Sequence, residues 1–358
     1  MSPEHIKLPE LIDSHVHFRE PGAIHKEDFE TGTKAALAGG FTTVIDMPNN
    51  PKPTISLNAL QNKFALTKDR IYCNLGFHFG TTETNFDQFK MVENQVFGLK
   101  VYMNDTTGNL LIENLSKLQQ IFQKWPREKP IIVHAEGKKL LTAISLARQY
   151  NKRLHVAHVA TKEDIEIISD AKNEGLLLTC EVTPHHLFLT DNDFKSLGPF
   201  AMMKPSLGTE KDRLALWKYL KMGVVDIISS DHAPHTKEEK NSVNPPFGVP
   251  GLESTLPLLL TTVAENKLSL DDLVRLTSTN PRKIFGLKRI QDTYTEIDLK
   301  ESYVISANNL HTKCAWSPFE GKRVVGKVVK VVIKNEIVFD GENIIGKPKG
   351  ELIYPNTT

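Results

Sequence analysis

Two histidines one residue apart, His15 and His17, stand at the end of the apolar run that begins at Leu8. Because alternate side chains of a strand point to the same face, a His-x-His pair at a strand end directs both imidazoles toward one point. Two converging neutral imidazoles indicate a metal site. A lone pair of this kind is more often two ordinary histidines, so the prediction depends on further ligand-type residues.

Further ligand-type residues recur where later strand-like runs end. They are Asn49, His78, Lys100, His134, His158, His185, His186 and Asp231. If these strand ends lie together, the first histidine pair and Asp231 can bind one divalent ion, and His134 with His158 can bind a second. Imidazole and carboxylate are ligands that zinc uses in catalytic sites.

Lys100 stands in an apolar strand-like run, residues 97–103, where a charged ammonium is poorly solvated. Two neighbouring cations would also repel it. We therefore expect the neutral amine to add CO2 and form N6-carboxylysine, which carries a negative charge and one oxygen for each ion. The alternative is a lysine whose ammonium reaches solvent at the strand end.

A zinc pair lowers the pKa of a water held between the ions and polarises a carbonyl. Asp231 would take the proton as the water attacks and return it to the leaving nitrogen. The expected reaction is hydrolysis of an amide-like bond, or its reverse. The alternative for Asp231 is a capping role in the loop that begins at Ser230.

The elements that must position these residues alternate along the chain. Eight strand candidates are residues 8–18, 42–47, 71–79, 96–103, 130–135, 153–159, 176–182 and 225–230. Helical patterns cover residues 28–38, 57–66, 110–124, 138–150, 162–173 and 210–221. Eight βα repeats favour an α/β fold, a (β/α)8 TIM barrel over residues 9–292, whose active-site face is the rim at the carboxyl ends of the strands. An open doubly wound sheet also fits the periodicity, but it would scatter several of the ligands.

Beyond about residue 293 the pattern changes to short strands separated by glycines. We expect residues 293–358, together with residues 1–8, to form a small β-rich accessory layer.

The formal net charge of +1 gives no electrostatic reason to bind nucleic acid or a membrane surface. Three dispersed cysteines, no secretory signal and no long apolar run predict a cytoplasmic protein.

A set of motifs follows in order along the chain. They are DSHVHFREPG at 13–22, HKEDF at 25–29, AGGFTTV at 38–44, MPN at 47–49, GLK at 98–100, VHAE at 133–136, HVAHVA at 155–160, TPHHL at 183–187 and SDHAPH at 230–235. In order and near-constant spacing the chain resembles the dihydroorotases of the amidohydrolase superfamily from about residue 10 to about residue 325. It is most similar to the dihydroorotase domain of the animal multifunctional pyrimidine-synthesis protein.

This resemblance implies a binuclear zinc barrel that interconverts dihydroorotate and N-carbamoyl-aspartate in de novo pyrimidine synthesis. The implied ligands of the first ion are His15, His17, Lys100 and Asp231, and those of the second are Lys100, His134 and His158. The implied substrate contacts are Arg19, Asn49 and His235 on the α-carboxylate, Thr106 on a mobile loop, and the backbone of Phe247 and Gly248 on the ring. The resemblance also implies a homodimer and suggests association with aspartate carbamoyltransferase.

Two positions depart from the family pattern. Lys204 stands where relatives place Asn or Arg before a proline, and it can meet a carboxylate only without the planar fork of arginine. Ala157 replaces a cysteine that some animal-type relatives use with a glutamate, here Glu181, to bind a third metal ion. We therefore expect two ions.

Other functions remain open at this stage. Allantoinases and hydantoinases (dihydropyrimidinases) share the metal ligands, but their neutral rings offer no carboxylate to Arg19. A catalytically inactive dihydroorotase-like scaffold is disfavoured because all six ligands are present. A dinucleotide-binding dehydrogenase is disfavoured because no G-x-G-x-x-G motif follows the first strand.

Overall fold

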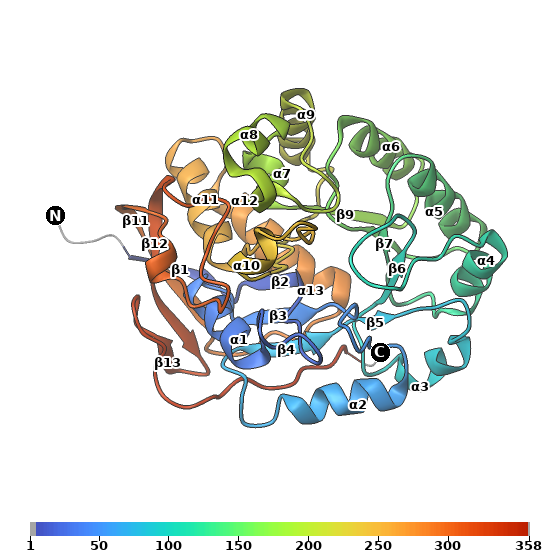
Figure 1. The fold of residues 1–358 in the computed structure, drawn as a ribbon, viewed down its shortest axis with the longest axis horizontal. Coiled ribbons are helices and arrows are strands. Elements are labelled where there is room, and N and C mark those ends of the chain that lie inside the picture. Colours follow the sequence, from blue (N-terminus) through green and yellow to red (C-terminus); the bar gives the residue numbers. More distant parts are fainter. Residues whose placement is uncertain (1–4, 357–358) are drawn as a thin grey trace.

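The computed structural model describes residues 5–356, in which parallel strands surround a common axis and helices cover them (Figure 1). The strands of this wall are β2 (Ile12–Val16), β3 (Thr43–Asp46), β4 (Asn74–Phe77), β5 (Phe79–Gly80), β6 (Leu99–Tyr102), β7 (Ile131–His134), β8 (Leu154–Val156), β9 (Leu178–Val182) and β10 (Ile227–Ile228). Hydrogen bonds join them in the orders β2-β3-β4 and β5-β6-β7-β8-β9-β10.

The two sheets form one barrel. β4 and β5 are two parts of one strand path that is interrupted at His78. β2 meets the chain that follows β10, where Val16 at the end of β2 bridges His232 in parallel and the His17 amide donates to the His232 carbonyl at 2.8 Å. The predicted TIM-barrel class is confirmed, and the carboxyl ends of the strands lie on one rim.

The helices are α1 (Phe29–Ala38), α2 (Leu57–Leu66), α3 (Phe89–Val92), α4 (Leu115–Lys124), α5 (Lys138–Gln149), α6 (Lys162–Asn173), α7 (Pro184–Phe188), α8 (Phe194–Leu197), α9 (Glu210–Lys221), α10 (Lys237–Lys240), α11 (Leu252–Ala264), α12 (Leu270–Val274) and α13 (Asn280–Phe285). Side-chain caps fix where several of them begin. Asp28 caps α1 and Thr209 caps α9, each in a reciprocal capping box. α4 buries Leu118, Ile121 and Phe122, the spacing of one helix face.

Several predicted boundaries are wrong, and three of them are instructive. The strand expected over residues 8–18 is two strands, because the chain leaves one sheet after Pro9 and enters the barrel at Ile12. The helix expected from residue 110 begins at Leu115, where the Asn114 side chain caps it. The strand expected over residues 225–230 is ordered as a strand only at Ile227–Ile228.

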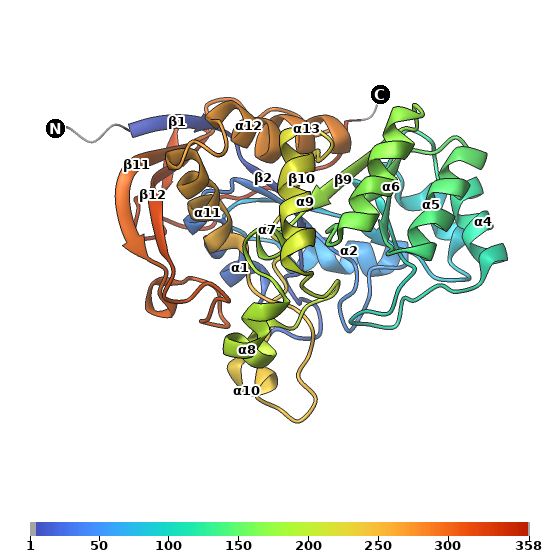
Figure 2. The same ribbon diagram turned by 90° about the horizontal axis from the view of Figure 1, so that it is seen from above.

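A second, antiparallel sheet lies on one side of the barrel next to α11 (Figures 1 and 2). Its order is β1 (His5–Pro9), β11 (Tyr294–Val304), β12 (Arg323–Ile333) and β13 (Glu336–Phe339). The Val325 amide donates to the Thr261 hydroxyl of α11 at 2.9 Å, which attaches the sheet to the barrel. Residues 1–4 of the predicted accessory layer lie outside the described residues, and the domain boundaries stay a prediction.

The C-terminal segment returns to the barrel and lies along β4. The Leu75 amide donates to the Glu351 carbonyl at 2.9 Å, and the Ile353 amide donates to the Leu75 carbonyl at 3.0 Å. β4 therefore has β3 on one edge and this segment on the other. Within residues 5–356, no helix is both long and apolar enough to cross a membrane.

Candidate metal centre

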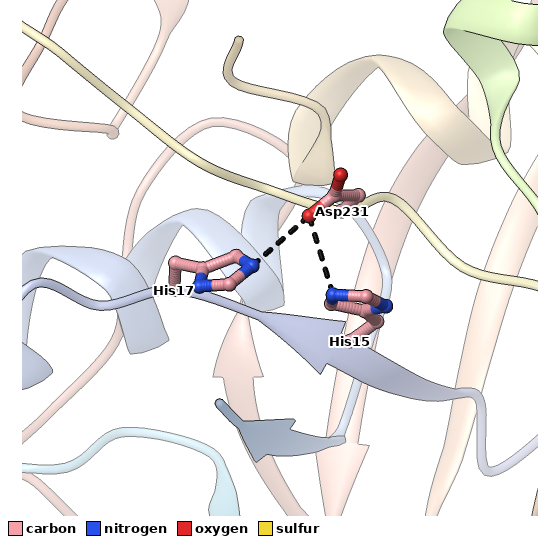
Figure 3. A group of neighbouring side chains, drawn as sticks. All are labelled: His15, His17 and Asp231. Atoms are coloured by element: carbon pink, nitrogen blue, oxygen red, sulfur yellow. Dashed lines mark hydrogen bonds and ion pairs between the residues drawn. The ribbon is translucent and has the colours of Figure 1, made fainter. Parts of the chain in front are cut away.

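His15 at the end of β2, His17 just beyond it and Asp231 after β10 meet at the carboxyl-end rim (Figure 3). One ligand atom from each lies within 4.8 Å of the others. Nε2 of His17 is 3.0 Å from Oδ1 of Asp231, and Nε2 of His15 is 3.4 Å from the same oxygen. All three residues are buried. Their two imidazoles and one carboxylate form a donor set that suits zinc.

Neighbouring side chains orient both imidazoles. Nδ1 of His15 contacts Glu181, whose other oxygen lies 3.2 Å from Nε2 of His155. Nδ1 of His17 lies 2.7 Å from Oδ1 of Asn49. Because these partners occupy Nδ1, each ring presents Nε2 to the centre, as in zinc sites whose histidines are held by a second hydrogen bond.

Lys100, His134 and His158 form the other half of the cluster. The His15 and His158 rings have centroids 5.3 Å apart, and Nδ1 of His134 lies 3.0 Å from Nε2 of His158. Among the described residues, Nζ of Lys100, Nε2 of His134 and Nδ1 of His158 are buried without a hydrogen-bond partner. Buried polar atoms rarely stay unpartnered, so these atoms fit a bound cation and a modified lysine.

Burial sets the charge state of these groups. It lowers the pKa of His15, and it lowers the pKa values of His17, His134 and His158 well below the usual range, so the rings are neutral as metal ligands must be. Burial also lowers the pKa of Lys100 to about 8, which raises the share of the neutral amine that can add CO2. The carboxyl pKa of Asp231 is raised by burial, which favours proton uptake.

The backbone at the rim is strained at three residues that carry the chemistry. Arg19, His158 and Asp231 have φ values of 62°, 37° and 46°. Non-glycine residues rarely adopt this left-handed region, at a cost of about 1–3 kcal/mol each. The surrounding packing must hold them there, and the strained backbone directs their side chains.

A pocket opens above the cluster, and it contains the predicted substrate contacts with one exception. It is lined by Arg19, Asn49, Thr106, Lys204, Phe247 and Gly248, as well as by all six predicted metal ligands. His235 is not in the lining. Its Nε2 lies 3.1 Å from Nη2 of Arg19 and 2.9 Å from the Phe247 carbonyl oxygen. His78, His185 and His186 also lie away from the pocket surface.

Arg19 is a buried cation that faces this pocket. Its Nε donates to the Pro234 carbonyl at 2.9 Å, and no carboxylate of residues 5–356 lies within ion-pair distance. Burial lowers the pKa of Arg19 only to about 10, so the guanidinium is charged at neutral pH. A side chain at Gly248 would come within 3.2 Å of Nη2, so glycine keeps this cation accessible.

The sequence interpretation missed Tyr102, Thr107, Met203 and Ala233, which also line the pocket. Tyr102 has a buried hydroxyl without a partner among the described residues, and Nζ of Lys100 lies 5.3 Å from its ring centroid. Tyr102 comes two residues after Lys100 on the same strand, so the two side chains share a face, and this spacing could have indicated Tyr102 as a pocket residue. The role of Glu181 in holding His15 had no local signal, because the two residues come from distant strands.

Comparison with known proteins agrees with this geometry. The model of a protein family described as "Amidohydrolase family" matches residues 6–290. The chain belongs to the amidohydrolase family. The multifunctional protein CAD of Squalus acanthias is 46% identical over 97% of this chain but only 15% of its own length. The dihydroorotase of Pyrococcus furiosus is 37% identical over 97% of this chain and 84% of its own.

Solved structures show the same fold for this amidohydrolase. The L-hydantoinase (dihydropyrimidinase) of Arthrobacter aurescens has a TM-score of 0.92 at 25% identity, covering 98% of this chain and 89% of its own. The inactive dihydroorotase-like domain of a Chaetomium thermophilum CAD-like protein has a TM-score of 0.84 at 28% identity, covering 98% and 99%. The resemblance to dihydroorotases stated from the motifs is confirmed.

Proposed function

We propose that this amidohydrolase is a zinc-dependent dihydroorotase, which interconverts dihydroorotate and N-carbamoyl-aspartate by opening and closing a cyclic amide. Arg19 carries the proposal. Its charged guanidinium faces the pocket with no carboxylate partner among the described residues, and a planar fork of this kind pairs with a substrate carboxylate. A relative named as a dihydroorotase, 37% identical over 97% of this chain, supports the same substrate.

Two zinc ions are part of this proposal. His15, His17, Asp231 and the carboxylated Lys100 would hold one, and Lys100, His134 and His158 would hold the other. When bound, zinc acts as a Lewis acid toward water and the amide carbonyl. The buried unpartnered nitrogens of Lys100, His134 and His158 support this ligand set.

The protein's own groups have separate tasks. Asp231 takes a proton from the attacking water and returns it to the amide nitrogen that leaves. Arg19 binds the carboxylate through its Nη atoms, because its Nε is committed to Pro234. Lys204 supplies a second cation, and its ammonium lies 4.8 Å from the centroid of the Phe247 ring.

The loop after β6 lines the pocket through Thr106 and Thr107. Nδ2 of Asn49 donates to the Thr107 carbonyl at 3.1 Å, and the Thr107 hydroxyl donates to the Phe247 carbonyl at 3.3 Å. These bonds join the loop to both sides of the pocket. The loop thereby excludes bulk water and brings Thr106 to the substrate.

An ultraviolet assay of dihydroorotate, with hydantoin and allantoin as neutral controls, tests the substrate. We expect kcat/KM for dihydroorotate to exceed that for either control by at least about 100-fold, because the controls leave Arg19 buried without an anion. Preference for a neutral ring would instead support a hydantoinase, the function named for the Arthrobacter structure.

Elemental analysis tests the metal proposal. We expect two zinc ions per chain in the wild type and fewer in Lys100→Met, which cannot form a carbamate. Metal-free protein should regain activity with zinc only when bicarbonate is supplied. Full zinc binding by Lys100→Met would refute the bridging role.

Sedimentation velocity, with and without aspartate carbamoyltransferase, tests the proposed homodimer and its proposed partner.

A further inference from the structure

Lys240 is a buried lysine on the rim side of the barrel, outside the metal cluster. It is the last residue of α10, which projects with α8 on the side opposite to α12 and α13 (Figure 2). Its side chain is fully buried, and no carboxylate of residues 5–356 pairs with it. Nζ donates to the carbonyls of Met202 at 3.1 Å, Pro246 at 2.9 Å and Gly248 at 3.1 Å.

An ammonium has three N–H donors and no acceptor, so these three carbonyls use its whole hydrogen-bonding capacity. Burial, together with the charge of Arg19, lowers the pKa of Lys240 to about 8, and the group is therefore still largely protonated at neutral pH. An apolar side chain at this position would leave three buried carbonyls without this donor, and each such loss is costly.

The three carbonyls belong to two segments that line the pocket. Met202 directly precedes Met203 and Lys204, and the other two carbonyls flank the pocket residue Phe247. The Gly248 amide also donates to the Met202 carbonyl at 2.9 Å. Neither segment is part of a helix or strand, so no regular hydrogen-bond ladder holds it in place.

We propose that Lys240 is a positioning residue that joins these two segments and thereby sets the affinity of the pocket for its substrate. The inference rests on the proposed function, since it assigns Lys204, Phe247 and Gly248 to substrate binding. None of the three hydrogen bonds that Nζ of Lys240 donates goes to Asp231 or to another predicted metal ligand. Its loss should therefore weaken binding and leave the chemical step nearly intact.

Lys240→Met is compared with Lys237→Met, which changes an exposed lysine of the same short helix. We expect Lys240→Met to raise KM for dihydroorotate by at least about tenfold with kcat within about threefold, the pattern of lost binding common to ground and transition states. Zinc content should be unchanged, and Lys237→Met should behave as the wild type. Unchanged KM, or loss of kcat together with zinc, would overturn the proposal.

Hydrogen exchange of the metal-loaded protein gives a readout that does not need activity. Lys240→Met should exchange faster than the wild type in peptides that cover residues 200–205 and 245–250, and Lys237→Met should not. If the wild type fails to turn over dihydroorotate, the proposed function fails while this comparison still tests Lys240. Should Lys240→Met not fold, Lys240→Gln, which keeps two N–H donors, is expected to show intermediate KM and exchange; wild-type values for it would overturn the proposal.

Discussion

Arg19 and Asp231 both line the pocket, yet their environments suit different tasks. Arg19 donates to the Pro234 carbonyl, lies beside His235 and keeps its charge, whereas Asp231 contacts two imidazoles and has a raised carboxyl pKa. A charged group without a counter-ion is suited to binding an anion, and a carboxylate that readily takes a proton is suited to proton transfer. The two tasks can therefore be separated by substitution.

Arg19→Met should raise KM for dihydroorotate by at least about 100-fold, because charge-assisted pairing with the substrate carboxylate is lost. Zinc content should stay at the wild-type value, since no metal ligand bonds to the guanidinium. Steady-state kinetics and elemental analysis measure both. Arg127→Met, at an exposed arginine, is the control. Parallel loss of substrate affinity and zinc would show that Arg19 supports the metal centre instead.

Asp231→Asn keeps the shape of the side chain but removes its capacity to take a proton. We expect kcat to fall by about 10²–10⁴-fold, the usual contribution of a positioned acid or base. Circular dichroism should show an intact fold. Wild-type turnover by this variant would remove Asp231 from the proton-transfer step.

At the scale of elements, α7 connects the rim to the segment that carries Lys204. Nδ1 of His186 lies 2.8 Å from the Thr183 hydroxyl, and Nε2 lies 3.1 Å from the Pro205 carbonyl. Burial lowers the pKa of His186 to about 4 from its usual value near 6.5. Between pH 6.5 and about 4, the ring is therefore neutral in the folded protein, whereas it would be charged in the unfolded chain.

This shift predicts a loss of stability in acid. Between pH 6.5 and about 4 the unfolded state binds a proton at His186 that the folded state does not, so the free energy of unfolding falls as the pH falls. The expected slope is about 1.4 kcal/mol per pH unit from this residue. Urea unfolding at pH 6, 5.5 and 5 should be less pH-dependent for His186→Gln by up to that amount. Parallel curves would contradict the shift.

At the scale of the whole molecule, the C-terminal segment completes an edge of the barrel wall beside β4. A Cβ at Gly350 would lie 2.0 Å from the Cys73 carbonyl oxygen, so the segment approaches the strand as closely as only glycine allows. Gly350→Ala should lower the free energy of unfolding by about 1–3 kcal/mol, the cost of overpacking. Urea unfolding measures this, with the exposed Lys347→Ala as control. Equal stabilities would show that the segment is not part of the cooperative fold.

The sequence by itself determined the barrel class and the family. Eight apolar runs at regular spacing and the ordered ligand motifs are local signals, because strand pattern and motif spacing are written in consecutive residues. The metal ligands and Arg19 could be named from them, and the structure brings these residues to one pocket. Their roles stay predictions.

Only the tertiary structure decided what holds those residues in place. Glu181 reaches His15 from another strand. Lys240 joins Met202 and Gly248, which belong to two segments more than 40 residues apart in the chain. The break after Pro9 depends on pairing with β11, and the left-handed backbone of Asp231 depends on its packing. Such contacts join residues distant in the chain, so no window of neighbouring residues contains them.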